Sequence, residues 1–245
     1  MENENPTNFP AQIMKNPKTS KAGFTMIEML VVIAIIAVLA TLLFSLASSM
    51  RNKASSSTSV SNLRQIGAAI LNYASDNNAT LPGPVLTDHF PLYQNNAKSG
   101  QLGWLLKDYL TPEPQPGNPQ PRMFYSSVLD YPAAKAKAKT AAGNSKPTYV
   151  VFSKQTDTVT GATFWPMGNY NPNSAGNTTP AMTTAQLSAK DTRGKLWITE
   201  IDQIIRPSTA KYGAGETPPH GKYRNTLMFD FSVKPVSLGE FEAND

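Results

Sequence analysis

The longest apolar stretch of the chain lies near its N-terminus, where apolar residues run from Met29 to Leu43 with Thr41 as the one interruption. The segment from Phe24 to Leu46 is 23 residues long. As an α-helix rising about 1.5 Å per residue, it is long enough to cross a bilayer core of about 30 Å. We therefore predict a membrane-spanning helix over residues 24–47.

After this stretch the composition becomes polar, but the remaining apolar residues still recur at the spacing of an α-helix. One face of the continuing helix is apolar, as expected for a helix that packs against a sheet. The serines and threonine of residues 55–59 are poor helix formers, so a flexible linker there is the alternative to one long helix. We favour an amphipathic continuation over residues 48–78, ended by the turn signals of residues 76–84. Its apolar face consists of Leu63, Ile66, Ile70 and Ala74.

Residues 79–245 predict a globular, loop-rich head of the α+β class. A short helix is expected at residues 102–110, and long loops are expected at the proline-rich residues 112–121 and at residues 168–180. Alternating β-branched and aromatic residues predict the strands. These strands are expected at residues 148–153, 195–201, 226–229 and 233–238.

Composition and charge narrow the functional classes. The chain has 245 residues, no cysteine and a formal charge of +5. Without cysteine, disulfides and thiolate metal sites are excluded, so the head must be stable by packing or with a bound ion. Lysines 135, 137 and 139 do not share one helical face, and we expect no nucleic-acid partner.

The residues Lys21-Ala22-Gly23-Phe24-Thr25-Met26-Ile27-Glu28 come directly before the apolar stretch. A carboxylate near the middle of a membrane helix costs about 2.5–3.5 kcal/mol on insertion scales, and less near the interface. The first turn of a helix favours a negative charge. One interpretation of Glu28 is therefore an interfacial carboxylate that faces lipid headgroups.

The motif Gly-Phe-Thr-x-Ile-Glu at residues 23–28 resembles the cleavage and assembly signal of type IV prepilins and type II secretion pseudopilins. An ordinary secretory signal places its apolar stretch before the cleavage point, whereas here the stretch follows it. The resemblance implies that prepilin peptidase recognises Lys21 and Gly23 and removes residues 1–23 as a leader. Phe24 then becomes the N-methylated first residue.

The same resemblance implies an assembly role for Glu28. Its carboxylate would pair with the α-amino group of Phe24 on an adjacent subunit and set the axial register, since opposite charges leave water together more easily than singly. The implied partners are other copies of the chain, other pilin subunits, the peptidase and an inner-membrane assembly platform. Ala37 and Ser45 replace a glycine and a proline of many relatives and favour a straighter helix.

A second motif lies near the C-terminus, where nine residues separate His220 from Asp230. It is similar to the His-x9-Asp-Gly signature of large pilin-like families, which implies a long helix packed on a small antiparallel sheet. Phe231 stands in place of the glycine, so we expect a wider turn or bulge rather than a tight turn with positive φ. Catalysis or zinc binding needs more partners than His89 and these two residues supply, and we predict that His220 and Asp230 cap or cross-link a β-hairpin.

These patterns predict a structural subunit rather than an enzyme. It would belong to a type II secretion pseudopilus or a type IV pilus-like filament, and the lack of cysteines common in adhesive pilins favours the pseudopilus. Alternatives are a minor or tip pilin that binds a ligand through residues 112–121 or 168–180, and a membrane-anchored periplasmic enzyme. No cofactor is expected except a structural calcium ion. Its candidate ligands are Asp191, Asp202 and Asp230.

The expected location is the bacterial inner membrane, crossed once. Lysines 15, 18 and 21 should stay cytoplasmic, which places the head in the periplasm and later in a filament in the periplasm or at the cell surface. Arg51 and Lys53 follow the apolar stretch and weaken this charge asymmetry.

Overall fold

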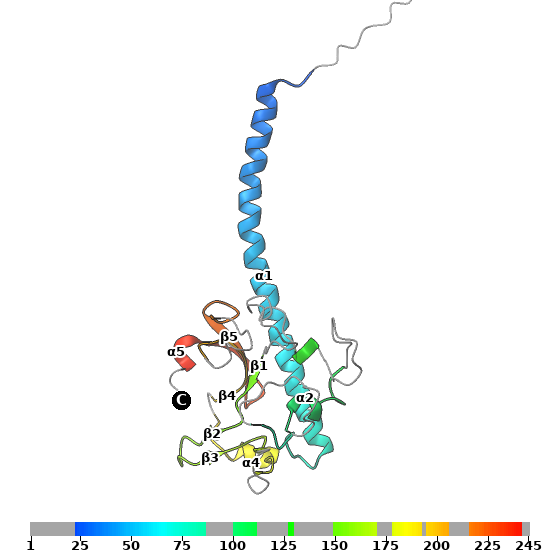
Figure 1. The fold of residues 1–245 in the computed structure, drawn as a ribbon, viewed down its shortest axis with the longest axis vertical. Coiled ribbons are helices and arrows are strands. Elements are labelled where there is room, and N and C mark those ends of the chain that lie inside the picture. The colour runs from blue at the N-terminus through cyan, green and yellow to red at the C-terminus, as the bar shows by residue number, and fades with distance from the viewer. Residues whose placement is uncertain are drawn as a thin grey trace, which may run out of the picture. The chain divides into compact units, whose positions relative to one another are not determined.

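The computed structural model describes seven segments of the chain, and its longest element is the helix α1 (Met26–Asp76) of 51 residues (Figure 1). The chain divides into two units, Met1–Ser48 and Ser49–Asp245. Residues 55–59 are helical, so the linker interpretation is wrong. The described segments are residues 23–86, 100–111, 127–129, 149–170, 178–192, 195–205 and 216–241.

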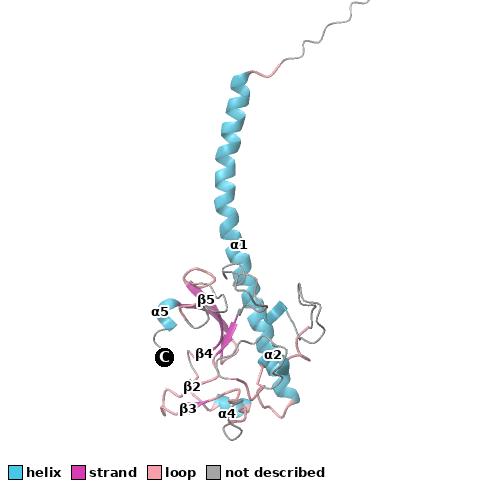
Figure 2. Cartoon of the chain, viewed as in Figure 1, coloured by secondary structure: helices cyan, strands magenta, loops and turns pink. Residues whose placement is uncertain are grey.

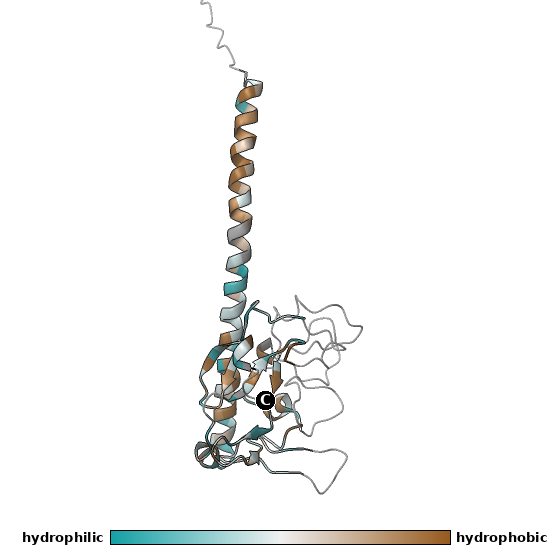
Figure 3. Ribbon diagram, turned by 90° about the vertical axis from the view of Figure 1, so that its left-hand side faces the viewer, coloured by the Kyte–Doolittle hydropathy of each residue, from teal (hydrophilic) through white to brown (hydrophobic). Residues whose placement is uncertain are grey.

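In the first unit, α1 consists mostly of hydrophobic residues, which Figure 3 colours brown. The large apolar side chains of this part are exposed, from 44% at Val32 to 92% at Met26. Among the described residues, α1 is the one helix long and apolar enough to cross a membrane, by length and composition. The sequence-based prediction of a long N-terminal helix is confirmed.

The second unit contains a four-stranded antiparallel sheet in the order β1-β4-β5-β6. Figure 2 colours the strands of the chain magenta. The four expected strands are confirmed with bounds that differ by a few residues. The antiparallel pair β2-β3 was not expected. The strands are β1 (Tyr149–Val151), β2 (Gln155–Thr156), β3 (Thr163–Phe164), β4 (Leu196–Glu200), β5 (Tyr223–Met228) and β6 (Val233–Ser237).

The described part of the head also contains short helices: α2 (Leu102–Leu105), η1 (Ser127–Leu129), α4 (Thr184–Ser188) and α5 (Leu238–Phe241). The helix expected at residues 102–110 is shorter than predicted. After α2 the chain turns, and the Leu106 carbonyl accepts hydrogen bonds from the N–H groups of Tyr109 and Leu110 at 3.0 and 3.1 Å. α4 begins with a capping box between Thr183 and Gln186, which satisfies two backbone donors of its first turn.

Some predictions fall wholly or partly outside the described residues. The predicted loop at residues 168–180 is described at its ends, where Asn169 and Thr179 exchange backbone hydrogen bonds of 2.9 and 3.0 Å. The remaining positions lie outside: residues 171–177, the proline-rich residues 112–121, His89, and lysines 15, 18, 21, 135, 137 and 139.

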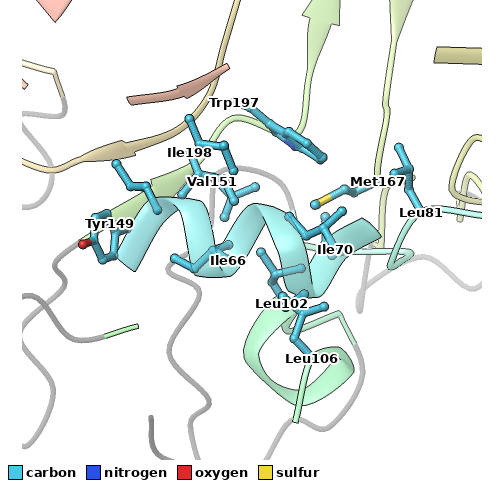
Figure 4. Close-up of a cluster of buried hydrophobic side chains, with 14 of the residues drawn as sticks. Ile66, Ile70, Leu81, Leu102, Leu106, Tyr149, Val151, Met167, Trp197 and Ile198 are labelled. Atoms are coloured by element: carbon cyan, nitrogen blue, oxygen red, sulfur yellow. The ribbon is translucent and has the colours of Figure 1, made fainter. Parts of the chain in front are cut away.

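The core of the head forms where the second half of α1 packs on the sheet (Figure 4). The predicted apolar face is buried, with Leu63, Ile66 and Ile70 at 0% exposure and Ala74 at 2%. Figure 4 shows α1 between the side chains of β1 and β4 and those of α2. Each fully buried aliphatic side chain contributes about 1.5–3 kcal/mol. This packing confirms the α+β class with a helix on a small antiparallel sheet.

The loop between β5 and β6 is tight and contains a left-handed residue. The Phe231 N–H donates to the Met228 carbonyl at 3.0 Å, and the Met228 N–H donates to the Ser232 carbonyl at 2.9 Å. This is the pattern of a three-residue hairpin loop with a bulge that usually has glycine in the left-handed position. Phe231 occupies that position with φ 61°, so the expected bulge is present, but the expectation that the turn avoids positive φ is wrong.

Packing of the Phe231 ring explains why phenylalanine is tolerated there. The left-handed conformation costs an ordinary L-residue about 1–2 kcal/mol. The ring packs edge-on against Trp197, with centroids 5.3 Å apart and planes at 77°. An aromatic pair of this geometry contributes about 0.5–1.5 kcal/mol beyond its buried area. Tertiary contact therefore offsets the local backbone cost.

Two substitutions at Phe231 separate the cost of its left-handed backbone from the contribution of its ring. We expect Phe231→Ala to lower the free energy of unfolding by about 2 kcal/mol, because it removes the ring and retains the strained Cβ. Phe231→Gly should be about 1 kcal/mol less destabilising than alanine, because glycine adopts positive φ without strain. Urea unfolding followed by tryptophan fluorescence measures both values. Equal or larger destabilisation by glycine would contradict the role given to backbone strain.

Candidate functional site

The N-terminus of α1 is built by a reciprocal contact between Thr25 and Glu28. The Thr25 N–H and hydroxyl donate to Glu28 Oε2 at 2.7 and 2.8 Å, and the Glu28 N–H donates to Thr25 Oγ1 at 3.3 Å. Thr25 is the N-cap and Glu28 the third helical residue, so the pair is a capping box. Sequence reasoning singled out both residues but not their contact, which the Thr-x-x-Glu spacing predicts.

Glu28 has hydrogen-bond donors in this cap but no counter-ion nearby along the chain. Residues 23–50 contain no lysine, arginine or histidine. The side chains of Phe24 and Ile27 around it are 73% and 70% exposed. The start of α1 therefore presents one negative charge, held in a defined position, among exposed apolar side chains. Gly23 lies just before this cap, and a Cβ added to it would have no atom within 4 Å.

The two residues of the C-terminal motif lie in different surroundings. The His220 side chain is 2% exposed, and its Nε2 lies 3.0 Å from Glu200 Oε1 and 3.1 Å from Asn225 Nδ2. Asp230 instead caps the loop between β5 and β6, where its Oδ1 accepts from the Ser232 N–H at 2.9 Å and from the Ser232 hydroxyl. The structure does not bring His220 and Asp230 together.

His220 belongs to a polar network that connects the sheet to α1. The Asn225 Nδ2 lies 3.1 Å from Ser56 Oγ, and the Asn225 backbone N–H donates to Glu200 Oε2 at 2.7 Å. The Tyr223 hydroxyl donates to Ser56 Oγ at 3.2 Å. We call Ser56, Glu200, His220, Tyr223 and Asn225 the Glu200 network. It supplies a donor to each oxygen of a carboxylate that is 0% exposed.

The network also indicates which ring nitrogen of His220 carries a hydrogen atom. One ring nitrogen cannot donate to Glu200 and accept from Asn225 at the same time. A buried carboxylate needs donors, so we assign the proton to His220 Nε2. The Asn225 amide then directs its N–H groups to the hydroxyl and carbonyl oxygens of Ser56, at 3.1 and 3.4 Å.

A buried ion pair lies beside this network. Arg224 contacts Asp202 with two nitrogens: Nε donates to Oδ2, and Nη2 donates to Oδ1 at 2.9 Å. Asp202 Oδ1 also accepts from the N–H groups of Ile204 and Ile205 at 2.8 and 3.0 Å. The pair thus fixes the turn that follows β4 to the neighbouring strand β5.

The three carboxylates proposed as calcium ligands have separate partners. Asp202 binds Arg224, Asp230 binds Ser232, and Asp191 accepts from the Thr158 hydroxyl. Within the described segments, no group of three or more His, Asp or Glu side chains is placed to hold a metal ion. Calcium therefore stays a prediction without an identified set of ligands.

Sequence reasoning missed Ser56, Glu200, Arg224 and Asn225. The sequence feature that could have revealed these residues is the presence of charged residues within strands. Glu200 ends the apolar strand β4, and Arg224 lies in β5. Charged residues at such positions are rarely buried unless they are paired. The identity of the partners was not readable, because Ser56 and Asn225 are 169 residues apart.

The His220–Glu200 contact should be measurable by a double-mutant cycle. We expect His220→Ala to lower the free energy of unfolding by about 1.5–3 kcal/mol, because a buried carboxylate loses a donor. His220→Ala added to Glu200→Gln should cost less than it does alone. The exposed Lys222→Ala is the control and should stay within about 0.5 kcal/mol of the wild type. Additive effects in the cycle, measured by urea unfolding, would exclude coupling between the two side chains.

Acid should weaken the loop that Asp230 caps. The Ser232 hydroxyl and N–H hold the pKa of Asp230 below its ordinary value, and the Lys234 ammonium at 3.7 Å adds to this effect. A depressed pKa in the folded state contributes stability above the unfolded value, and the contribution is lost as pH falls through the folded value. Asp230→Asn should therefore destabilise the head at pH 7 and match the wild type well below about pH 4. Unfolding curves across this pH range test the difference, and a constant gap between the two proteins would contradict it.

Residues 18–44 match the family model described as the prokaryotic N-terminal methylation motif. The match covers Gly23, the capping box of Thr25 and Glu28, and the exposed apolar residues of α1 up to Phe44. No curated protein and no solved structure matches the chain with significant similarity.

Proposed function

Because the chain carries the N-terminal methylation signal of type IV pilins and pseudopilins, we propose that it is a structural subunit of a filament. Prepilin peptidase cuts after Gly23, Phe24 is methylated, and the subunit assembles through α1. The observation that carries this proposal is the matched motif at the start of an exposed apolar helix, with a carboxylate fixed in its first turn. We favour a type II secretion pseudopilus over a type IV pilus-like fibre, because the chain has no cysteine.

Before assembly, lipid covers the apolar side chains of the first unit. An apolar helix and a pilin signal fit an inner-membrane anchor, with the leader in the cytoplasm and the head in the periplasm. On assembly, α1 helices of neighbouring subunits replace the lipid. Because these side chains surround the helix, each subunit can contact neighbours on several sides.

Glu28 supplies the register of this assembly. Cleavage after Gly23 creates a positive α-amino group on Phe24, one residue before the N-cap. Residues 23–50 contain no basic side chain, and we infer that Glu28 pairs with the α-amino group of Phe24 of an adjacent subunit rather than with that of its own chain. A charge without its partner in an apolar interior costs several kcal/mol, so subunits out of register are disfavoured.

Processing is tested by mass spectrometry of the mature protein. We expect an N-terminal methyl-phenylalanine at Phe24 in the wild type, because the matched motif is a methylation signal. Gly23→Val should retain the leader. A Cβ at this position meets no atom within 4 Å, so a failure to cut reports peptidase recognition rather than misfolding. An intact leader on the wild type would contradict the proposal.

Assembly is tested by two matched substitutions at the capping box. Glu28→Gln retains a residue that can cap the helix but removes the charge, whereas Thr25→Ala removes the cap and retains the charge. We expect Glu28→Gln to lower the amount of subunit in sheared filaments by at least about tenfold, because an unpaired buried charge costs more than 1.4 kcal/mol. Thr25→Ala should reduce it far less. The reverse order would show that Glu28 acts only as a helix cap.

A further inference from the structure

The charged residues of α1 between Glu28 and Asp76 are all basic. Between Glu28 and Asp76 the helix contains no acidic residue and three basic ones, Arg51, Lys53 and Arg64. Arg51 and Lys53 are exposed. Neither makes an ion pair with any residue that the structure describes. These two cations lack the acidic partners at i±3 or i±4 that commonly accompany exposed helical cations.

Their spacing along the helix places them beside lipid headgroups if the apolar segment spans a bilayer. At 1.5 Å per residue, Arg51 and Lys53 lie about 6 and 9 Å beyond Ala47 along the helix. A bilayer of about 40–45 Å with a core of about 30 Å leaves about 5–8 Å for headgroups on each side. Long basic side chains adjust to this depth by extending towards the interface. Arg64, about 25 Å beyond Ala47, is past that region.

The two cations point in opposite directions around the helix. Residues two apart on an α-helix are about 200° apart around its axis. A single protein partner on one side of α1 would contact one of them, whereas lipid surrounds the helix and reaches both. Their arrangement therefore fits headgroups better than one partner chain.

We propose that Arg51 and Lys53 form a basic collar that binds the phosphate groups of anionic phospholipids in the leaflet on the side of the head. This inference rests on the membrane insertion in the proposed function. The Arg51 guanidinium can donate two hydrogen bonds to one phosphate, and the Lys53 ammonium adds a point charge. Each cation near an anionic surface increases binding about fivefold. The collar holds the subunit in the bilayer until assembly withdraws it.

The test uses the full chain in vesicles of phosphatidylcholine and phosphatidylglycerol. Spin-labelled versions of the two lipids report, by electron paramagnetic resonance, which one associates with the protein. We expect the wild type to prefer phosphatidylglycerol, and the double variant Arg51→Gln/Lys53→Gln to lose roughly fivefold of this preference per cation. Arg64→Gln removes the same charge from the same helix and should leave the preference unchanged. The lysines of the leader also attract phosphatidylglycerol, and this contribution to the lipid preference is the same in every variant.

Several outcomes would overturn the proposal. A double variant with the preference of the wild type, or an Arg64→Gln variant that loses as much, would show that the collar does not select the lipid. A double variant that keeps its lipid preference but is absent from filaments would assign the two cations to a contact between subunits. A chain that does not float with either vesicle fails at membrane insertion, and the collar fails with it. If the chain floats with the vesicles and prefers phosphatidylglycerol but forms no filament, the result contradicts the proposed filament function and leaves the basic collar supported.

Discussion

Burial of one face of α1 against the sheet is the interaction on which the head depends. Three aliphatic side chains of this face, Leu63, Ile66 and Ile70, are completely buried. Gly67 lets the helix approach β5 closely, since a Cβ there would lie 3.2 Å from Leu227 Cδ1. The same helix presents apolar side chains on all sides in the first unit. One element thus serves as the core of the head and as an apolar segment that needs other molecules around it.

Hydrophobic burial alone does not fix how α1 sits on the sheet, because the attraction has little directionality. The Glu200 network supplies directed contacts: Ser56 of α1 meets Asn225 and Tyr223 of β5, and His220 holds Glu200. A rotation or slide of the helix would leave the buried Asn225 amide without its Ser56 partner, at a cost of about 1–3 kcal/mol. The direct contacts to the helix come from Asn225 and Tyr223, and His220 lies beside them, 3.1 Å from Asn225 Nδ2.

The sequence was informative wherever periodicity or local spacing determines structure. The apolar face of α1 and the four main strands follow from side-chain period, and the Thr25–Glu28 cap follows from a spacing of three residues. Phe231 was not predictable, because the rule that reserves positive φ for glycine is overridden by a ring contact with Trp197. The Glu200 network was not predictable either, because its members come from α1, β4, β5 and the segment before β5.

The capping box and the proposed ion pair of Glu28 are compatible, because they use different parts of the carboxylate. Thr25 donates its hydrogen bonds to Oε2, and a carboxylate accepts through both oxygens at about four lone-pair positions. The cap therefore fixes the side chain without saturating it. A flexible glutamate would lose rotamer entropy on meeting a neighbouring amine, whereas one already held by Thr25 has lost most of it. The spacing that starts the helix would therefore also position Glu28 for the proposed ion pair, in addition to the capping contact that Thr25 makes in the structure.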